Sequence, residues 1–188
     1  RDEIINETAA LSDKGAGMCV GKTYPNVDVR IITISDDQIE TWSDDLVLQQ
    51  GEIGEIVVKG PVVTKTYLHR PESTAQAKIR EGGEIWHRMG DVGYFDKQGR
   101  LWFCGRKAHR VETKAGLIFP VPLEPYFNQI EGVFRSAIVN SGDFAALVIE
   151  PEKTASNQKD TIQSKANEII LEQGLEDRVI SIHFLADF

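Results

Sequence analysis

An aspartate and an arginine, each next to a glycine, bracket a short aromatic-rich segment in the middle of the chain. Asp91 follows Met89-Gly90, and Arg106 follows Gly105, within the run WHRMGDVGYFDKQGRLWFCGR. A carboxylate can accept hydrogen bonds from two adjacent hydroxyls, and a guanidinium can donate to hydroxyl or phosphate oxygens. If the two groups lie side by side, they have the chemistry to hold a nucleotide ribose.

The segment between these residues predicts a hairpin that would bring them together. The run GYF enters a DKQG turn, in which Gly99 permits a positive φ, and RLWFC leaves it. Pairing the two strands in register places Asp91 and Arg106 at the same end of the ribbon. The spacing alone also fits a plainer arrangement, in which Asp91 caps a turn and Arg106 pairs with it on the surface. The wider pattern of the chain has to decide between them.

The wider pattern resembles the adenylate-forming enzymes, a superfamily of acyl-CoA synthetases, luciferases and adenylation domains of peptide synthetases. The stretches GAGMCVGKTYPNVDVRI and GEIGEIVVKGPVVTKTYLHRPESTAQAKI are similar to two of its blocks. Trp86 precedes Asp91 as in the family's WxxTGD motif. A GxFDxxGxLxxxGR pattern is then matched by Gly93, Asp96, Gly99, Leu101, Gly105 and Arg106. The resemblance extends from about residue 15 to about residue 150.

The resemblance implies nucleotide-binding roles for three residues. Asp91 matches the aspartate that binds the ribose hydroxyls of ATP and of the acyl-adenylate, and Arg106 matches an arginine that reaches the same nucleotide. Phe103 matches a position that contacts the ribose or the base, although an aromatic residue within a strand fits the protein core equally well. Met89 departs from the motif, because it replaces the threonine and removes a hydroxyl beside the ribose-binding carboxylate.

The resemblance also places a hinge and a lid loop in this chain. Lys107 and Ala108 fall in the hinge, and Ala108 stands where the family usually has an aspartate or lysine that absorbs rotation of the C-terminal lid. Lys107 could supply charged contacts instead. Ala115 and Gly116 fall in the lid's glycine loop, and the unusually apolar Leu117-Ile118-Phe119 follows them.

The implied reaction has two halves. A carboxylate attacks the α-phosphate of ATP with Mg²⁺ and releases pyrophosphate, and a second nucleophile, usually the thiol of coenzyme A, then attacks the acyl-adenylate. The amino-acid sequence resembles most a branch of fatty-acid CoA ligases and of bacterial olefin-biosynthesis enzymes that close an adenylated β-hydroxy acid to a β-lactone. Ala108 fits lactone closure, since no thiol need then enter. Coenzyme A ligation and lactone closure both remain open, with a fatty-acid-like carboxylic acid as the expected substrate.

Several of the family's motifs are not found in the sequence. These are the loop that cradles the triphosphate, the motif that binds adenine and Mg²⁺, and the lysine segment near the family's C-terminus. We therefore expect no catalytic residue and no metal ligand in this chain. We interpret it as a piece that lacks its own N-terminal part, stops before the terminal lysine motif, and is inactive alone. A non-catalytic binding module that keeps the scaffold is the alternative from another class.

Composition limits the classes of function. The chain has 188 residues, 41% of them hydrophobic, and a net charge of −8, so a nucleic-acid partner is not expected. No apolar run of about 18 residues is found, which indicates no transmembrane segment and a cytoplasmic protein. Cys19 and Cys104 lack metal spacing and are predicted to be buried thiols. His87 and His109 flank the proposed nucleotide site, where surface hydrogen bonding is the favoured interpretation.

The predicted fold class is α+β, with a distorted β-barrel subdomain followed by a small βαββαβ-like lid. Residues 1–105 would end a large N-terminal domain, 106–109 would form the hinge and 110–188 the lid. In the barrel, strands are expected at 27–34 and 55–59 and a hairpin at 85–102. Helices are expected around 6–11 and at 71–79, the second with a serine or threonine at its start. In the lid, helices are expected at 123–130 and 154–173, and strands at 133–140, 144–151 and 179–184.

Overall fold

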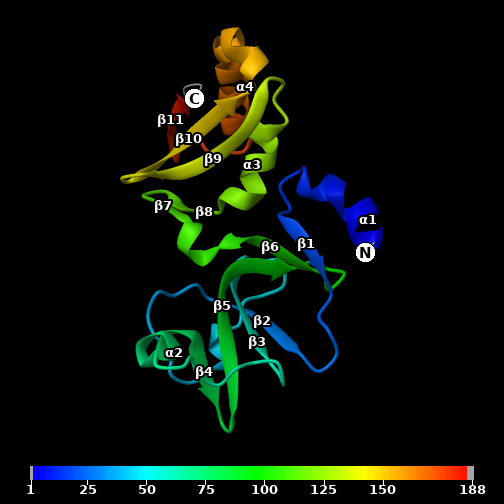
Figure 1. Ribbon diagram of the computed structural model, residues 1–188, viewed down its shortest axis with the longest axis vertical. Coiled ribbons are helices and arrows are strands. Elements are labelled where there is room, and N and C mark those ends of the chain that lie inside the picture. The colour runs from blue at the N-terminus through cyan, green and yellow to red at the C-terminus, as the bar shows by residue number, and fades with distance from the viewer. Residues whose placement is uncertain (1, 186–188) are drawn as a thin grey trace. The chain divides into compact units, whose positions relative to one another are not determined.

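The computed structural model of the protein describes residues 2–185 (Figure 1). The chain divides into two compact units, one made of Arg1–Ile5 and Gly17–Ala108 and the other of Asn6–Ala16 and His109–Phe188. The ends of the predicted barrel and lid, at residues 1 and 186–188, lie outside the described residues. Helices and strands are mixed in one chain, so the predicted α+β class is confirmed. The predicted limits of barrel, hinge and lid stay a prediction.

The first unit is built on a curled six-stranded sheet. Its order is β1-β6-β5-β3-β2, and β4 also pairs with β5. The strands are β1 (Met18–Gly21), β2 (Asp28–Ile32), β3 (Gly54–Lys59), β4 (Lys78–Glu81), β5 (Glu84–Phe95) and β6 (Leu101–Arg106). The long strand β5 carries β3 along one edge and β4 and then β6 along the other (Figure 1). Every strand around the candidate nucleotide site is therefore positioned by β5.

The predicted hairpin is present as β5, a turn and β6. The Gly99 amide donates to the Asp96 carbonyl at 2.9 Å, and Gly99 has a φ of 71°, as the turn requires.

The segment around Trp42 folds back onto the sheet, where the Trp42 ring stacks on Trp86 with centroids 4.4 Å apart. This acidic segment includes the 3₁₀ turn η1 (Asp44–Leu46), and it covers part of the core around Ile79.

The helix predicted at residues 71–79 is shorter, and its start was wrongly explained. Helix α2 covers Pro71–Ala77, and the next two residues belong to β4, because pairing with β5 outweighs helix continuation. We expected a serine or threonine to cap its start. Instead Pro71 occupies the first turn, and the Thr74 hydroxyl donates to the Arg70 carbonyl at 2.7 Å.

The second unit packs two helices against a three-stranded sheet of order β11-β10-β9 (Figure 1). Its elements are β7 (Val111–Thr113), β8 (Gly116–Ile118), α3 (Pro120–Asn128), β9 (Val133–Ser141), β10 (Phe144–Pro151), α4 (Lys159–Glu172) and β11 (Val179–Phe184). Strand β11 runs parallel to β10, as the crossover through α4 requires. The predicted βαββαβ-like arrangement is found, except that β7 and β8 form a separate two-stranded sheet in place of the first strand.

Two helices of the second unit differ from the prediction in their bounds. The single helix expected at 154–173 is a 3₁₀ helix, η3 (Lys153–Gln158), which is kinked at Ala155, followed by α4, which starts after the non-helical Gln158 with φ −103° and ψ 9°. Helix α3 begins at Pro120, earlier than expected, since proline is favoured in the first helical turn. The short N-terminal helix is α1 (Asp2–Ser12), and the Asp13 carbonyl after it accepts a hydrogen bond from Gln129 Nε2 at 2.8 Å.

A buried ion pair joins β5 to β3 in the first unit. The Arg88 and Glu55 side chains are 3% and 1% exposed, and Arg88 Nη2 lies 2.7 Å from Glu55 Oε2. Arg88 Nε donates to the other carboxylate oxygen at 3.2 Å. Its remaining donors reach the carbonyls of Ser35, Asp37 and Gln76. A charge without water is tolerated only when its hydrogen bonds are satisfied, and this guanidinium meets that condition.

Replacing Arg88 by methionine should cost about 3–5 kcal/mol of unfolding free energy, because the Glu55 carboxylate would stay buried without its main partner. Lys107 Nζ lies 3.4 Å from Glu55 Oε2 and would still partly neutralise the Glu55 carboxylate, so we expect a loss near the lower end of this range. Urea denaturation measures the change. The exposed Arg30 on β2 provides the control, since Arg30→Met should change stability by less than about 0.5 kcal/mol. Equal losses for the two variants would contradict this role of the pair.

Candidate functional site

Asp91 and Arg106 lie directly opposite each other at the end of the β5–β6 hairpin, as the sequence predicted. Arg106 Nη1 is 2.9 Å from Asp91 Oδ1. The Arg106 side chain is 60% exposed and the Asp91 side chain only 19%. The hairpin therefore presents a solvent-exposed guanidinium beside a largely enclosed carboxylate.

The Asp91 carboxylate keeps an unused acceptor. Its Oδ1 is buried, and within residues 2–185 it accepts no hydrogen bond, so the short contact with Arg106 is an ion pair without hydrogen-bond geometry. Buried polar atoms nearly always have a hydrogen-bond partner, and an exception needs an explanation. A ligand hydroxyl that donates a hydrogen bond to Oδ1 would provide the missing partner.

A β-bulge in β6 brings Phe103 to the same face as this pair. Val92 is opposite Gly105 and Gly93 is opposite Phe103, so Cys104 is an extra residue in β6. Side chains alternate between faces in a regular strand, which would place Phe103 and Arg106, three residues apart, on opposite sides. Because of the extra residue Cys104, the Phe103 side chain instead lies on the same face of the hairpin as the side chains of Asp91 and Arg106.

The surroundings of Phe103 favour a contact role over a core role. Its ring is only partly buried, while its neighbours Trp102 and Cys104 are 1% and 0% exposed. Opposite it, Gly93 cannot be replaced, since a Cβ there would come within 2.2 Å of the Trp102 carbonyl oxygen. The sequence did not reveal the bulge, because an extra residue is visible only once the partner strand's register is known.

The predicted hinge residues have very different surroundings. Lys107 begins the short 3₁₀ turn η2 (Lys107–His109), and its Nζ donates to the Ser35 carbonyl at 2.8 Å and lies 3.4 Å from Glu55 Oε2. Ala108 is exposed and is the last residue of the first unit. Of these two residues, Lys107 makes charged contacts, which link it to the buried Glu55–Arg88 pair, and their role as a hinge stays a prediction. Nothing in the sequence signalled Glu55 as its partner.

The predicted lid loop is the turn between β7 and β8. Ala115 and Gly116 are exposed, Gly116 has a φ of 118°, and its carbonyl accepts a hydrogen bond from the Thr113 hydroxyl at 2.7 Å. Ile118 is buried in the core of the second unit, whereas Leu117 is 40% exposed. The apolar run after the glycine is thus divided between core and surface.

The remaining candidates are structural. Cys19 and Cys104 are free and buried, and burial raises the pKa of the Cys104 thiol to about 12. Burial also lowers the pKa of His87, whose Nδ1 lies 3.1 Å from the Ala77 carbonyl oxygen. Over residues 2–185, no cluster of His, Cys, Asp and Glu has the geometry to hold a metal ion, and no helix is long and apolar enough to cross a membrane.

Comparison with known proteins was made by sequence and by fold, and no family model matches the chain. The chain is 50% identical to the olefin β-lactone synthetase of Stenotrophomonas maltophilia over 149 residues. The matched region covers 77% of this chain and 27% of that protein. A 2-succinylbenzoate–CoA ligase of a Geobacillus species is 38% identical over 106 residues, or 56% of this chain and 21% of the ligase. The chain spans about a quarter of the length of these curated relatives.

Solved structures share the fold. The O-succinylbenzoate coenzyme A synthetase of Bacillus subtilis, in complex with AMP, has a TM-score of 0.68 at 20% identity, covering 90% of this chain and 32% of that one. ATP-bound MatB of Rhodopseudomonas palustris has a TM-score of 0.71 at 24% identity, with the same coverage of 90% and 32%. The 50% identity to two olefin β-lactone synthetases, over 77% and 73% of this chain, identifies it as part of the adenylate-forming, AMP-binding superfamily, as the resemblance predicted, and the solved structures agree with this in fold. Within that superfamily, half of its matched residues are identical to those of olefin β-lactone synthetases.

The turn that closes the hairpin depends on one carboxylate. Burial acts to raise the pKa of Asp96, but the hydrogen bonds that it accepts from Trp102 Nε1, from Arg100 and from the Gln98 amide outweigh burial and lower the pKa to about 2. The side chain is 14% exposed. A group with a depressed pKa stabilises the fold above its unfolded value of 3.8 and loses that effect as the pH falls toward 2.

Asp96→Asn should therefore lower the unfolding free energy by about 1–2 kcal/mol between pH 5 and 7, with the difference from the parent chain shrinking toward zero near pH 2. Urea unfolding at a series of pH values measures this. The exposed Asp177 gives a matched control, because Asp177→Asn should leave the pH profile unchanged. A constant difference for Asp96→Asn at every pH would show that the ionised carboxylate is not responsible.

Proposed function

We propose that the chain is the C-terminal part of an ATP-dependent enzyme that activates a carboxylic acid as an acyl-adenylate. The observation that carries this proposal is the Asp91–Arg106 pair with its buried, unused acceptor oxygen. Membership of the AMP-binding superfamily supports it. The sequence identity to named synthetases and ligases supports the same class of chemistry.

In this proposal the hairpin binds the ribose of ATP and of the acyl-adenylate. The two ribose hydroxyls donate hydrogen bonds to the Asp91 carboxylate, one of them to the unused Oδ1. Arg106 turns from Asp91 toward a hydroxyl or phosphate oxygen, which its exposure allows. Phe103, on the same face, packs against the sugar or the base.

The proposed reaction proceeds in two steps. The substrate carboxylate attacks the α-phosphate of ATP, forms the acyl-adenylate and releases pyrophosphate. A nucleophile then attacks the acyl carbonyl, loses its proton and expels AMP. The groups that hold the triphosphate and Mg²⁺ would lie outside this chain. The part played by these residues is to bind and orient the nucleotide through both steps.

For the second step we favour attack by the substrate's own β-hydroxyl, which closes a β-lactone. The 50% identity to olefin β-lactone synthetases, against 38% to a CoA ligase, supports this choice. Ala108 supports it as well, since the position where the family usually has an aspartate or lysine carries no charge here, which agrees with a reaction in which no thiol enters. A long-chain β-hydroxy acid would be the substrate, and a cytoplasmic location remains a prediction.

Coenzyme A ligation is the second candidate. In that case residues 106–109 would act as the hinge and residues from 110 onward as the lid, with Ala115 and Gly116 in the lid loop. Lys107 would hold the hinge to the first unit through Glu55. The candidate from a different class is a binding module that has kept the scaffold without the chemistry.

In the full-length protein, Asp91→Ala should reduce ATP-dependent pyrophosphate release about 10- to 100-fold, mainly through a higher KM for ATP, because hydrogen bonds to a charged group are lost. The exposed Asp28 on β2 gives a matched control, and Asp28→Ala should retain full activity. An Asp91→Ala enzyme with an unchanged KM for ATP would remove Asp91 from the nucleotide site.

The second nucleophile can be identified in the full-length protein by supplying ATP with long-chain 3-hydroxy acids or plain fatty acids, with and without coenzyme A. We expect the hydroxy acid to be consumed and a β-lactone to form without coenzyme A. Strict dependence on coenzyme A would establish thioester ligation instead. A folded protein that releases no pyrophosphate with any acid would leave the binding module as the explanation.

A further inference from the structure

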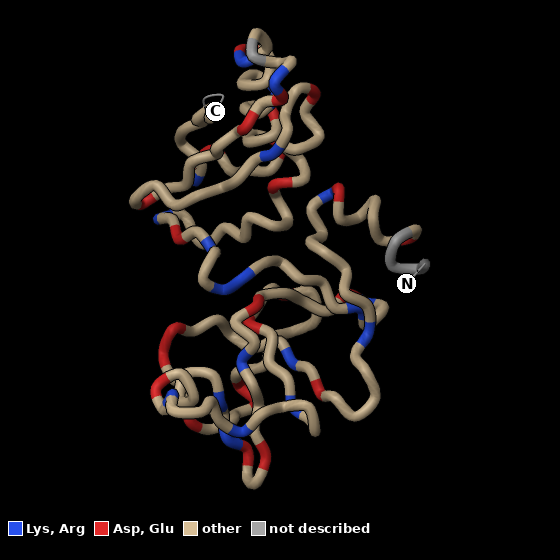
Figure 2. The backbone as a smooth tube through the Cα atoms, in the orientation of Figure 1, with Lys and Arg blue, Asp and Glu red and all other residues tan. Residues whose placement is uncertain are grey.

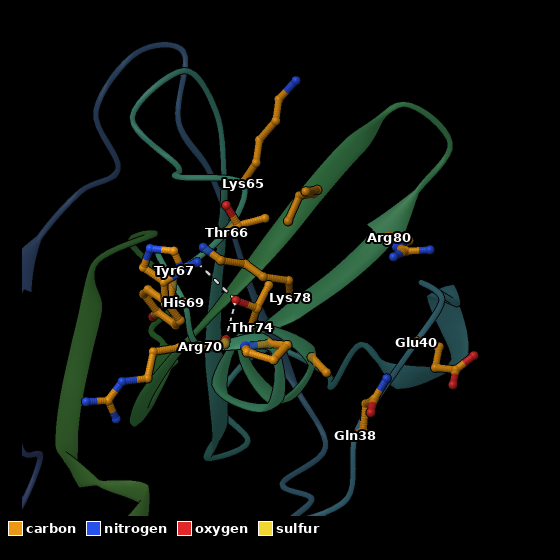
Figure 3. Close-up of a pocket in the computed structure, with 13 residues that line it drawn as sticks. Gln38, Glu40, Lys65, Thr66, Tyr67, His69, Arg70, Thr74, Lys78 and Arg80 are labelled. Carbon is orange, nitrogen blue, oxygen red and sulfur yellow. Dashed lines mark hydrogen bonds between the residues drawn. The ribbon is translucent and has the colours of Figure 1, made fainter.

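A second set of chemically active side chains surrounds a pocket of about 660 Å³ in the first unit (Figure 3). Its walls come from the segment around Gln38, the loop that leads into α2, and strand β4. None of the three predicted nucleotide-binding residues lines it. Lys78, which lines the pocket, is opposite His87 on β5, and His87 is four residues before Asp91. Four residues of a strand span about 13 Å, which separates the pocket from Asp91 along β5. The pocket is therefore a separate feature.

Positive charge is concentrated around this pocket. Four cations, Lys65, Arg70, Lys78 and Arg80, line it together with a single carboxylate, Glu40. Over the rest of the backbone, acidic and basic positions are interspersed (Figure 2), and the whole chain has a net charge of −8. A local excess of positive charge in an acidic chain marks a place that attracts anions.

These cations also lack the ion-pair partners that several other cations of the unit have. Lys59, Arg88 and Arg100 each form an ion pair with a carboxylate. Among residues 2–185, no ion pair is found for any of the four pocket cations. In Figure 3, Lys65 and Arg70 extend outward around the rim, and Arg80 lies on the far side beside Glu40. Their charges are available to a ligand.

Lys78 is the unusual member of the set, because it is buried. The residue is 6% exposed, and its ammonium donates one hydrogen bond, to the Thr64 hydroxyl at 3.3 Å. It also lies 5.2 Å from the centroid of the Tyr67 ring. Burial lowers the pKa of Lys78. A buried ammonium has three donors and normally needs a paired anion, and none of the described residues forms an ion pair with Lys78.

The loop beside Lys78 is held in one conformation. The Tyr67 amide donates to the Thr74 hydroxyl at 3.0 Å, and that hydroxyl donates to the Arg70 carbonyl, as the dashed lines of Figure 3 show. His69 has a φ of 54°, a left-handed conformation that few non-glycine residues adopt. Hydrogen bonds hold this strained turn, and local backbone strain of this kind gathers at binding sites.

We propose that this pocket binds a small phosphorylated molecule that carries at least two negative charges, with Lys78 as its anchor. A phosphate oxygen accepts from the Lys78 ammonium, and the flexible side chains of Lys65, Arg70 and Arg80 close onto the remaining oxygens. The volume lies within the range of small-molecule sites and exceeds what a simple ion fills. Four cations against one carboxylate favour a phosphate ester or diphosphate over a monocarboxylate.

The test uses inorganic pyrophosphate as the probe and the 188-residue chain as the protein, with calorimetry for affinity and amide NMR shifts for location. We expect binding of one pyrophosphate per chain, with shifts at Lys78, Tyr67 and Arg70. Lys78→Met should weaken binding about tenfold or more. Methionine keeps the apolar stem and removes a buried charge, so this variant should fold at least as stably as the parent.

Two further measurements separate this site from general charge attraction. Lys114→Met removes an exposed lysine that pairs with Asp143 in the second unit, and it should leave the affinity unchanged. Arg80→Gln should weaken binding severalfold without affecting stability. Equal losses for Lys78→Met and Lys114→Met would overturn the proposal, as would shifts confined to Asp91 and Arg106.

The longer protein provides the last comparison. If the isolated chain binds pyrophosphate through Lys78 but the full-length protein cannot, the pocket is covered by another part of its own chain and the proposal fails. Failure to bind pyrophosphate in either protein also overturns it. Since no pocket residue belongs to the Asp91 pair, either result leaves the proposed adenylation chemistry unaffected.

Discussion

The first unit is organised around a single desolvated guanidinium. Arg88 ties β5 to β3 through Glu55, and it contacts the loop after β2 through the carbonyl of Asp37 and helix α2 through the carbonyl of Gln76. The Lys107 ammonium reaches the same carboxylate. Since β5 positions every neighbouring strand, this one charge and its acceptors determine where the hairpin begins and where the first unit ends.

The sheet places the buried ion pair and the candidate nucleotide site on opposite faces. Glu55 is directly opposite Val92, and consecutive residues of a strand face opposite ways, so the Glu55–Arg88 pair and the Asp91–Arg106 pair lie on different sides of β5. The first pair is buried and fully hydrogen-bonded, whereas the second retains an unused acceptor. A buried, hydrogen-bonded ion pair on one face thus lies behind a partly exposed ion pair on the other.

Local sequence signals predicted much of this arrangement. Turn residues and aromatic alternation gave the hairpin and the juxtaposition of Asp91 with Arg106, because both depend on neighbours in the chain. The end of α2 was missed, since only pairing with β5 makes Lys78 part of a strand. Glu55 was read as one residue of an apolar strand, because its partner Arg88 is 33 residues away. Burial of a charge depends on such distant partners and leaves no local signature.

The bulge at Cys104 also restricts how this segment can change during evolution. Substitutions in β6 alter one side chain at a time and leave the directions of the others intact. Loss of the one extra residue would reverse the face of everything on one side of it, so that Phe103 and Arg106 no longer point the same way. The stretch from Gly93 to Arg106 is therefore expected to vary in composition among functional relatives while keeping a constant length.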